Sequence, residues 1–135
     1  MRQANSKRLK RARDYIRDAY LEPLSLKQIA AEANLSPYHF LRIYKKTYQE
    51  TPHDFATRLR IEKAKALLAK GDHNVTDACF EVGFSSLGSF SMLFTKQVGI
   101  PPSEFQKHVR SSIVVPHPIR SIFVPSCFAS MYFRS

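Results

Sequence analysis

Tyr38, Leu41, Arg42 and Lys45 are suited to contacts with a base or a phosphate, and they recur at spacings of three and four residues. That spacing places them on one face of a helix. A guanidinium such as that of Arg42 can donate two parallel hydrogen bonds to guanine, and an ammonium such as that of Lys45 neutralises phosphate. The pattern indicates contact with a nucleic acid.

The charge of the chain supports the same interpretation. The 135 residues include 21 Lys and Arg against 11 Asp and Glu, a formal net charge of +10. Residues 1–70 carry 16 basic and 7 acidic side chains, whereas residues 71–135 carry 5 and 4. A polyanionic partner is therefore expected, and the first half should dominate affinity for its backbone. The length suits one compact domain or two small ones sharing a helix and excludes a large multi-domain enzyme.

The other reactive side chains indicate neither catalysis nor a cofactor or metal site. None of the histidines pairs with Cys, Asp or Glu at ligand spacing, and Cys79 and Cys127 form no CxxC pair. His39 is the one histidine expected to donate to a phosphate. The basic run from Lys7 to Arg13 is interpreted as a solvated helix face. Without an apolar leader or 18 consecutive apolar residues, we expect no membrane association and a cytoplasmic, nucleoid-associated location in a bacterium.

Apolar periodicity, capping residues and glycines predict an all-α fold of about seven helices. Ser25, Ser36 and Thr51 each offer a capping oxygen, the last two directly before a proline, and Gly71, Gly83 and Gly99 mark breaks. The expected helices span residues 7–20, 26–33, 37–48, 52–70, 75–82, 86–97 and 102–109.

An internal repeat is the most informative feature of this sequence. Its first part has an offset of 49 residues and pairs Ala30 with Cys79, Asn34 with Gly83, Leu35 with Phe84 and Ser36 with Ser85. After one extra residue the offset is 50, pairing Phe40 with Phe90, Tyr44 with Phe94, Lys46 with Lys96, Pro52 with Pro102 and Phe55 with Phe105.

Each copy has the requirements of a helix-turn-helix. Ala30 and Cys79 are small enough for two helices to cross closely, while Asn34 and Gly83 tolerate the left-handed turn conformation. The second helix of such a unit enters the major groove. The candidate DNA-binding residues are Ser36, Tyr38, His39, Leu41, Arg42, Lys45 and Lys46 in the first copy, and Ser85, Ser86, Leu87, Gly88, Ser89, Ser91, Met92 and Lys96 in the second.

Three segments resemble the DNA-binding domain of the AraC/XylS family: SLKQIAAEANLSPYHFLRIYKKTYQETP, RLRIEKAKALLAKG and VTDACFEVGFSSLGSFSMLFTKQVGIPPSEFQK. The linker pattern R-L-x-x-x-x-A-x-x-L-L, the V-G-F turn and the closing G-x-x-P-x-x-F carry the resemblance, which covers roughly residues 7–108. It implies two helix-turn-helix subdomains bridged by a helix of roughly 27 Å, which insert recognition helices 37–48 and 86–97 into successive major grooves. It further implies a transcription regulator that is an activator contacting RNA polymerase.

Residue by residue, Arg42 matches the family's groove-reading arginine, Tyr38 its aromatic contact, and Lys45 and Lys46 its basic residues. The second copy departs from the family pattern, with Leu87, Gly88 and Met92 where a polar pair and an arginine are frequent. Recognition is thus expected to be uneven, and the second copy to supply little beyond apolar contact with thymine methyl groups, helped by its serines.

The expected domains are an N-terminal subdomain (7–51), a linker helix (52–70), a C-terminal subdomain (71–110) and an apolar tail (111–135). The tail contains three prolines and no acid, which suggests irregular structure or two short strands. It would pack on the body, pair with another chain or belong to a longer C-terminal region.

A chain of this length resembles the small stand-alone, MarA-like members of the family, which are controlled by abundance. We expect binding to double-stranded DNA as a monomer, with a dimer through the tail as the alternative. The rival function is a basic architectural protein that binds duplex DNA without regard to sequence.

Overall fold

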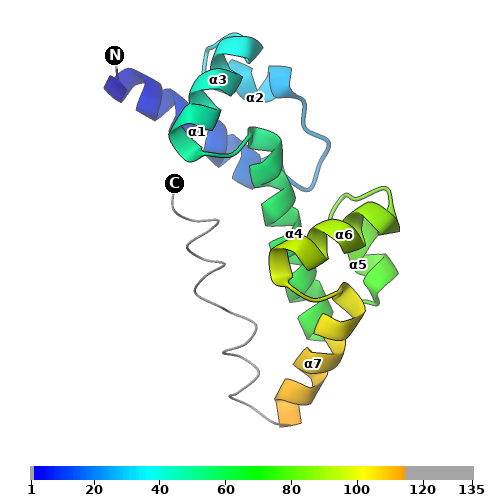
Figure 1. The fold of residues 1–135 in the computed structure, drawn as a ribbon. Coiled ribbons are helices and arrows are strands. Elements are labelled where there is room, and N and C mark those ends of the chain that lie inside the picture. The colour runs from blue at the N-terminus through cyan, green and yellow to red at the C-terminus, as the bar shows by residue number, and fades with distance from the viewer. Residues whose placement is uncertain (1, 115–135) are drawn as a thin grey trace. The chain divides into compact units, whose positions relative to one another are not determined.

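The computed structural model describes residues 2–114, which fold into seven helices (Figure 1). The all-α prediction is confirmed for this part of the chain. The helices are α1 (Arg2–Ala19), α2 (Leu26–Glu32), α3 (Pro37–Tyr48), α4 (Pro52–Lys70), α5 (Val75–Glu81), α6 (Leu87–Val98) and α7 (Pro102–Val114). Among them, none has the length and hydropathy that crossing a lipid bilayer requires.

The helix starts follow from the predicted caps. Ser25 Oγ accepts a hydrogen bond from the Gln28 amide at 3.1 Å and so begins α2. At the start of α4, Thr51 Oγ1 accepts from the Asp54 amide at 3.0 Å, while the Thr51 amide donates to Asp54 Oδ2 at 3.4 Å. This reciprocal pair satisfies two amides that the first turn of a helix leaves unpaired.

The chain divides into two compact units within α4, between Leu59 and Arg60. The first contains α1, α2, α3 and the start of α4, around a core to which all four helices contribute. Phe40, Tyr44 and Tyr48 form an aromatic row along α3, with ring centroids 5.4 Å and 4.7 Å apart. The domain boundaries expected at residues 51 and 70 stay a prediction.

The second unit contains the remainder of α4 and α5, α6 and α7. Its core also has an aromatic row, in which the rings of Phe84, Phe90, Phe94 and Phe105 lie 5.2 to 5.6 Å apart. Two hydrogen bonds between elements add to this packing. Gln97 Nε2 donates to Glu62 Oε2 at 3.2 Å, and Gln106 Nε2 donates to the His73 carbonyl at 2.8 Å.

Both turns adopt the predicted left-handed conformation, with φ of 56° at Asn34 and 96° at Gly83. The small residues Ala30 and Cys79 are fully buried at the corresponding places of α2 and α5. The amides of Leu35 and Phe84 each donate at 3.1 Å to the carbonyls of those two residues. The repeat is therefore a structural one, with the same tight corner in each unit.

One pairing within the repeat was wrong. Ser36 is the cap of α3 and Ser86 the cap of α6, so the structural counterpart of Ser36 is Ser86 rather than Ser85. The extra residue of the second copy therefore lies within its turn, before the cap.

The outermost helix ends also differ from the predictions. The first helix begins at Arg2 rather than residue 7, since good helix formers extend it beyond its first core contact, Leu9. The last helix continues to Val114, with Ser111 Oγ donating to the Lys107 carbonyl at 3.1 Å. Residues 111–114 are thus helical, which corrects the irregular tail expected there. The rest of the expected tail, with its strands and dimer contact, lies outside the described residues.

Candidate nucleic-acid interface

The position of α3 in the core of the first unit decides which of its side chains are exposed. Phe40 and Tyr44 are both fully buried, one helical turn apart on the same face. Ser36 Oγ accepts a hydrogen bond from the His39 amide at 3.3 Å, and Pro37 occupies the first turn. The helix is thereby fixed in start and rotation, and its opposite face is left exposed.

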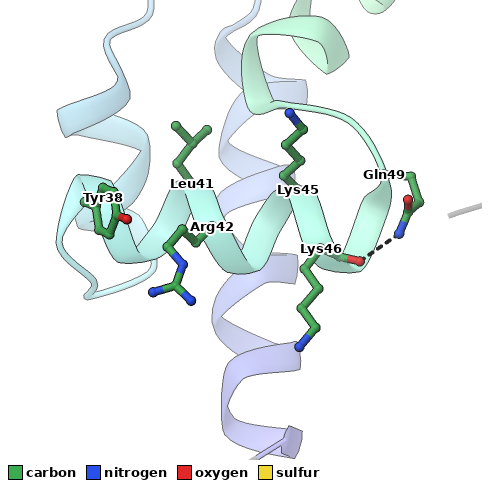
Figure 2. Close-up of a pocket in the computed structure, with 6 residues that line it drawn as sticks. All are labelled: Tyr38, Leu41, Arg42, Lys45, Lys46 and Gln49. Carbon is green, nitrogen blue, oxygen red and sulfur yellow. Dashed lines mark hydrogen bonds between the residues drawn. The ribbon is translucent and has the colours of Figure 1, made fainter.

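That exposed face carries most of the first group of predicted DNA-binding residues (Figure 2). An open hollow runs along it, lined by Tyr38, Leu41, Arg42, Lys45, Lys46 and Gln49. In the figure, Leu41 and Lys45 extend to one side of the helix and Arg42 and Lys46 to the other, with Tyr38 at the N-terminal end. The structure therefore brings five predicted residues onto one surface, with three cations and no carboxylate among the lining side chains.

Tyr38 and Arg42 lie next to each other on this surface. Tyr38 is 73% exposed, and Arg42 Cζ lies 5.8 Å from the centroid of its ring. A cation at this distance from an aromatic face is attracted by the ring quadrupole. The tyrosine therefore helps to hold the guanidinium along the helix while leaving its donors exposed.

Two further predicted residues lie at the start of the helix, away from this hollow. Ser36 and His39 are both exposed, and the Ser36 hydroxyl oxygen is engaged in capping. The structural role of Ser36 is therefore established by its hydrogen bond, while its contact with DNA remains a prediction.

Gln49 lines the hollow, and sequence reasoning missed it. It follows the helix in a left-handed conformation with φ of 61°, and its Nε2 donates to the Lys46 carbonyl at 2.9 Å. The repeat contained a signal for it, since the residue at the corresponding place of the second copy is Gly99, which also has a left-handed conformation with φ of 101°.

The counterpart helix α6 is positioned in the same way. Phe90 and Phe94 are fully buried, and Ser86 Oγ accepts from the Ser89 amide at 3.3 Å. The predicted residues on its outer side are exposed except for Ser91, which is half-buried: Ser85, Ser86, Leu87, Gly88, Ser89, Met92 and Lys96. This surface has one cation, where that of α3 has three.

An arginine from the first helix supports the base of α3. Arg13 Cζ lies 4.2 Å from the ring centroid of Tyr48 and 4.1 Å from that of Phe55, so its guanidinium sits between the two aromatic rings. It thus joins α1 to the C-terminal end of α3 and the start of α4. Part of the N-terminal basic run is therefore structural, rather than only solvated as expected.

A second hollow, in the other unit, has the opposite charge. It is lined by Asp72, His73, Asp77, Phe80 and Glu81. His73 Nδ1 and Asp72 Oδ1 are 2.8 Å apart, and this hydrogen bond lowers the pKa of the Asp72 carboxyl. An acidic lining disfavours contact with phosphates, so α5 is not expected to face DNA.

Chemistry at other side chains has little support between residues 2 and 114. No group of three metal-binding side chains occurs in that part of the chain. Burial raises the pKa of the Cys79 thiol, whose Sγ donates weakly to the Ser86 carbonyl at 3.8 Å. A thiol held in its protonated form and enclosed by packing is unreactive.

Comparisons with known proteins agree with this arrangement. Residues 29–108 match the family model described as a helix-turn-helix domain. The MmsAB operon regulatory protein of Pseudomonas aeruginosa is 36% identical over 96 residues, covering 71% of this chain and 31% of that protein. The chain spans 31% to 40% of the length of three curated relatives that it matches.

Two solved structures have the same fold. A probable AraC family transcriptional regulator from Rhodopseudomonas palustris superposes with a TM-score of 0.73 at 26% identity, over 76% of this chain and 97% of that one. The DNA-binding domain of AdpA, solved in complex with a target DNA, gives a TM-score of 0.69 at 22% identity, over 76% and 93% of the two chains. The family that these related proteins represent regulates transcription and is not enzymatic. The chain belongs to the AraC/XylS family of helix-turn-helix, DNA-binding transcription regulators.

Proposed function

We propose that this protein activates transcription from promoters that carry a specific duplex sequence, which it reads by inserting α3 and α6 into successive segments of the major groove. The observation that carries this proposal is the exposed face of α3. There, Arg42, Lys45 and Lys46 surround a hollow on the second helix of a helix-turn-helix. In such units this is the helix that enters the groove.

The three cations are proposed to have different roles. Arg42, near the middle of the helix, is the residue that donates to a guanine edge, while Lys45 and Lys46 neutralise phosphates. Tyr38, Leu41 and Gln49 complete the contact surface. Ser36 and His39, at the start of the helix, are proposed to contact the DNA backbone.

Binding measurements test the sequence specificity. The full chain selects sequences from a pool of random duplexes, and fluorescence anisotropy then compares a selected duplex with a scrambled one across salt concentrations. We expect tighter binding to the selected duplex at every salt concentration, by at least 10³-fold near physiological salt. Equal affinity would overturn the proposal in favour of an architectural protein that ignores sequence.

Protection of guanine N7, an atom of the major groove, from methylation tests the two-groove arrangement. We expect two protected major-groove segments about one helical turn apart on the selected duplex, with one protein monomer bound. A single protected segment would show that only one of the two helices enters the groove.

Transcription with purified RNA polymerase tests the activator role. On a promoter that carries the selected site, added protein should raise the yield of transcript, since we propose contact with the polymerase. A decrease would identify a repressor instead. Acting on bacterial DNA in this way, the protein would work in the cytoplasm.

A further inference from the structure

The outer face of α6 carries the apolar Met92 where the outer face of α3 carries the cation Arg42. Arg42 and Met92 are each the sixth residue after the capping serine of their helix. Met92 is 66% exposed, and Leu87, at the first position of α6, is 40% exposed. Aligned by the caps, the pairs are Tyr38 with Gly88, Leu41 with Ser91, Arg42 with Met92, Lys45 with Thr95 and Lys46 with Lys96.

Packing within the second unit does not account for these exposed apolar side chains. The buried face of α6 is supplied by Phe90, Phe94 and Val98. Leu87 and Met92 are absent from that cluster and expose a large part of their surface. Isolated exposed apolar residues are ordinary, but two on the face that a helix-turn-helix presents to DNA are available for contact.

Charged hydrogen-bond donors are fewer on this face, which otherwise offers the exposed hydroxyl groups of Ser85, Ser86 and Ser89. Thr95, the counterpart of Lys45, donates its hydroxyl proton to the Ser91 carbonyl at 2.7 Å within the helix. Ser91 itself is half-buried. Lys96 is the exposed cation of the helix and, as the counterpart of Lys46, is placed for a phosphate. Base recognition by hydrogen bonds is therefore much poorer here than on α3.

Gly88 leaves the first turn of α6 without a side chain at its second position. A Cβ at this position would meet Ser86 Oγ at 3.8 Å, an ordinary contact, so internal packing does not demand a glycine. Glycine within a helix is unfavourable relative to alanine. The counterpart residue, Tyr38, is large and exposed. A position without a side chain leaves room for the backbone of this first turn to approach a partner closely.

We propose that α6 reads thymine, through van der Waals contact of Met92 and Leu87 with the C5-methyl groups of T·A pairs. That methyl group is the apolar feature of the major groove, and it distinguishes thymine from the other bases. This inference rests on the proposed function and adds to it: the half-site of α3 is specified by hydrogen bonds to guanine, and the half-site of α6 by shape and apolar contact.

Uracil substitution isolates the methyl group, because uracil differs from thymine at that one position. In a duplex selected by the full chain, each thymine is replaced in turn by uracil and the affinity is measured by anisotropy. The half-site of α3 is assigned as the one whose base preference is lost in Arg42→Ala. In the other half-site, we expect one or two uracils to weaken binding about fourfold each, the cost of one lost methyl contact.

Side-chain variants then tie this loss to α6. In the double variant Leu87→Ala/Met92→Ala, the same uracils should have no further effect, because the contact is already gone. Phe80→Ala is the matched control, since Phe80 is 53% exposed on α5 of the same unit and should leave the uracil effect intact. Met92→Arg should create a guanine preference at one of these positions. Circular dichroism checks that each variant is folded.

The outcomes separate this inference from the proposed function. A selected sequence whose uracil effect disappears in the double variant supports both. A selected sequence without a uracil effect in the half-site of α6, or with one that the double variant retains, overturns the thymine reading and leaves the regulator intact. Failure to select any sequence overturns the proposed function, and the thymine reading with it.

Discussion

Glu50 Oε2 accepts a 2.8 Å hydrogen bond from Arg58 Nη2, and the same oxygen lies 3.8 Å from Arg13 Nη2. The side chains of these residues are 14%, 3% and 12% exposed. One carboxylate in the turn between α3 and α4 thus compensates two nearly buried guanidinium groups, one on α1 and one on α4. Because burying a charge is costly unless it is paired, this ion network ties α3 to its neighbours through a single residue.

Removing the charge of Glu50 should therefore destabilise the protein strongly. Glu50→Gln keeps the shape but removes the negative charge that Arg58 and Arg13 share, so the free energy of unfolding should fall by about 3 kcal/mol. Urea denaturation at pH 7 measures this. Asp14→Asn is the control, because its ion pairs with Lys10 and Arg17 are exposed and should be worth under about 1 kcal/mol. Similar losses in the two variants would show that the network contributes no more than a surface pair.

Tyr44 makes the free energy of unfolding depend on pH in the alkaline range. Burial raises the pKa of its phenol above the ordinary value of 10.0. The folded state therefore holds this proton more tightly than the unfolded state. The resulting contribution to stability is complete below pH 10 and is lost as pH rises above it. Tyr44→Phe removes this titration and with it the pH dependence, so the variant should lose less stability than the wild type between pH 9 and about pH 11.

The same variant also tests the hydroxyl at neutral pH. Among the described residues, the buried Tyr44 hydroxyl has no hydrogen-bond partner, and the equivalent residue of the second unit is Phe94. An unsatisfied buried polar group is costly, so Tyr44→Phe should raise the free energy of unfolding at pH 7 by about 1 kcal/mol. Thermal or urea denaturation measures this. A lower free energy of unfolding in the variant would show that the hydroxyl contributes to stability.

Truncation of Arg42 and truncation of Lys45 should have different effects on DNA binding. Arg42→Ala should relax preference at one base position, where a bidentate contact is worth about 1 to 3 kcal/mol of discrimination. Lys45→Ala should weaken all duplexes alike and reduce the slope of log K against log salt by about one unit. Anisotropy with the selected duplex and its single-base variants, across salt concentrations, compares them. Identical behaviour would show that the assigned roles are wrong.

A larger side chain at the helix crossing of each helix-turn-helix should destabilise the protein. Cys79 is fully buried where α5 crosses α6, so Cys79→Leu should lower the free energy of unfolding by about 1 to 3 kcal/mol through overpacking. Cys79→Ala, which reproduces the Ala30 of the first unit, is the matched control and should cost less. Denaturant titration measures both. If the Leu variant were as stable as the Ala variant, the helix crossing would have space for a larger side chain.

Local sequence signals were sufficient for most of the fold. Caps such as Ser25 and turn residues such as Asn34 and Gly83 act within a few residues of the chain, so their effect is visible without tertiary structure. The predictions of the two outermost helix ends were wrong because no such local signal marks them. Residues 2–6 contribute little to the apolar pattern, and their helical state follows from continuation of a turn already formed.

For the candidate interface, helical spacing placed Tyr38, Leu41, Arg42 and Lys45 on one face, because an α-helix repeats every 3.6 residues. The family resemblance added Lys46. Which face is exposed depended on the packing of Phe40 and Tyr44, and the addition of Gln49 depended on a left-handed cap. The pairing of Glu50 with Arg13 and Arg58 joins residues up to 37 positions apart. Contacts of that kind arise from the way helices stack, and so the tertiary structure alone decided which charges are structural and which remain exposed for DNA.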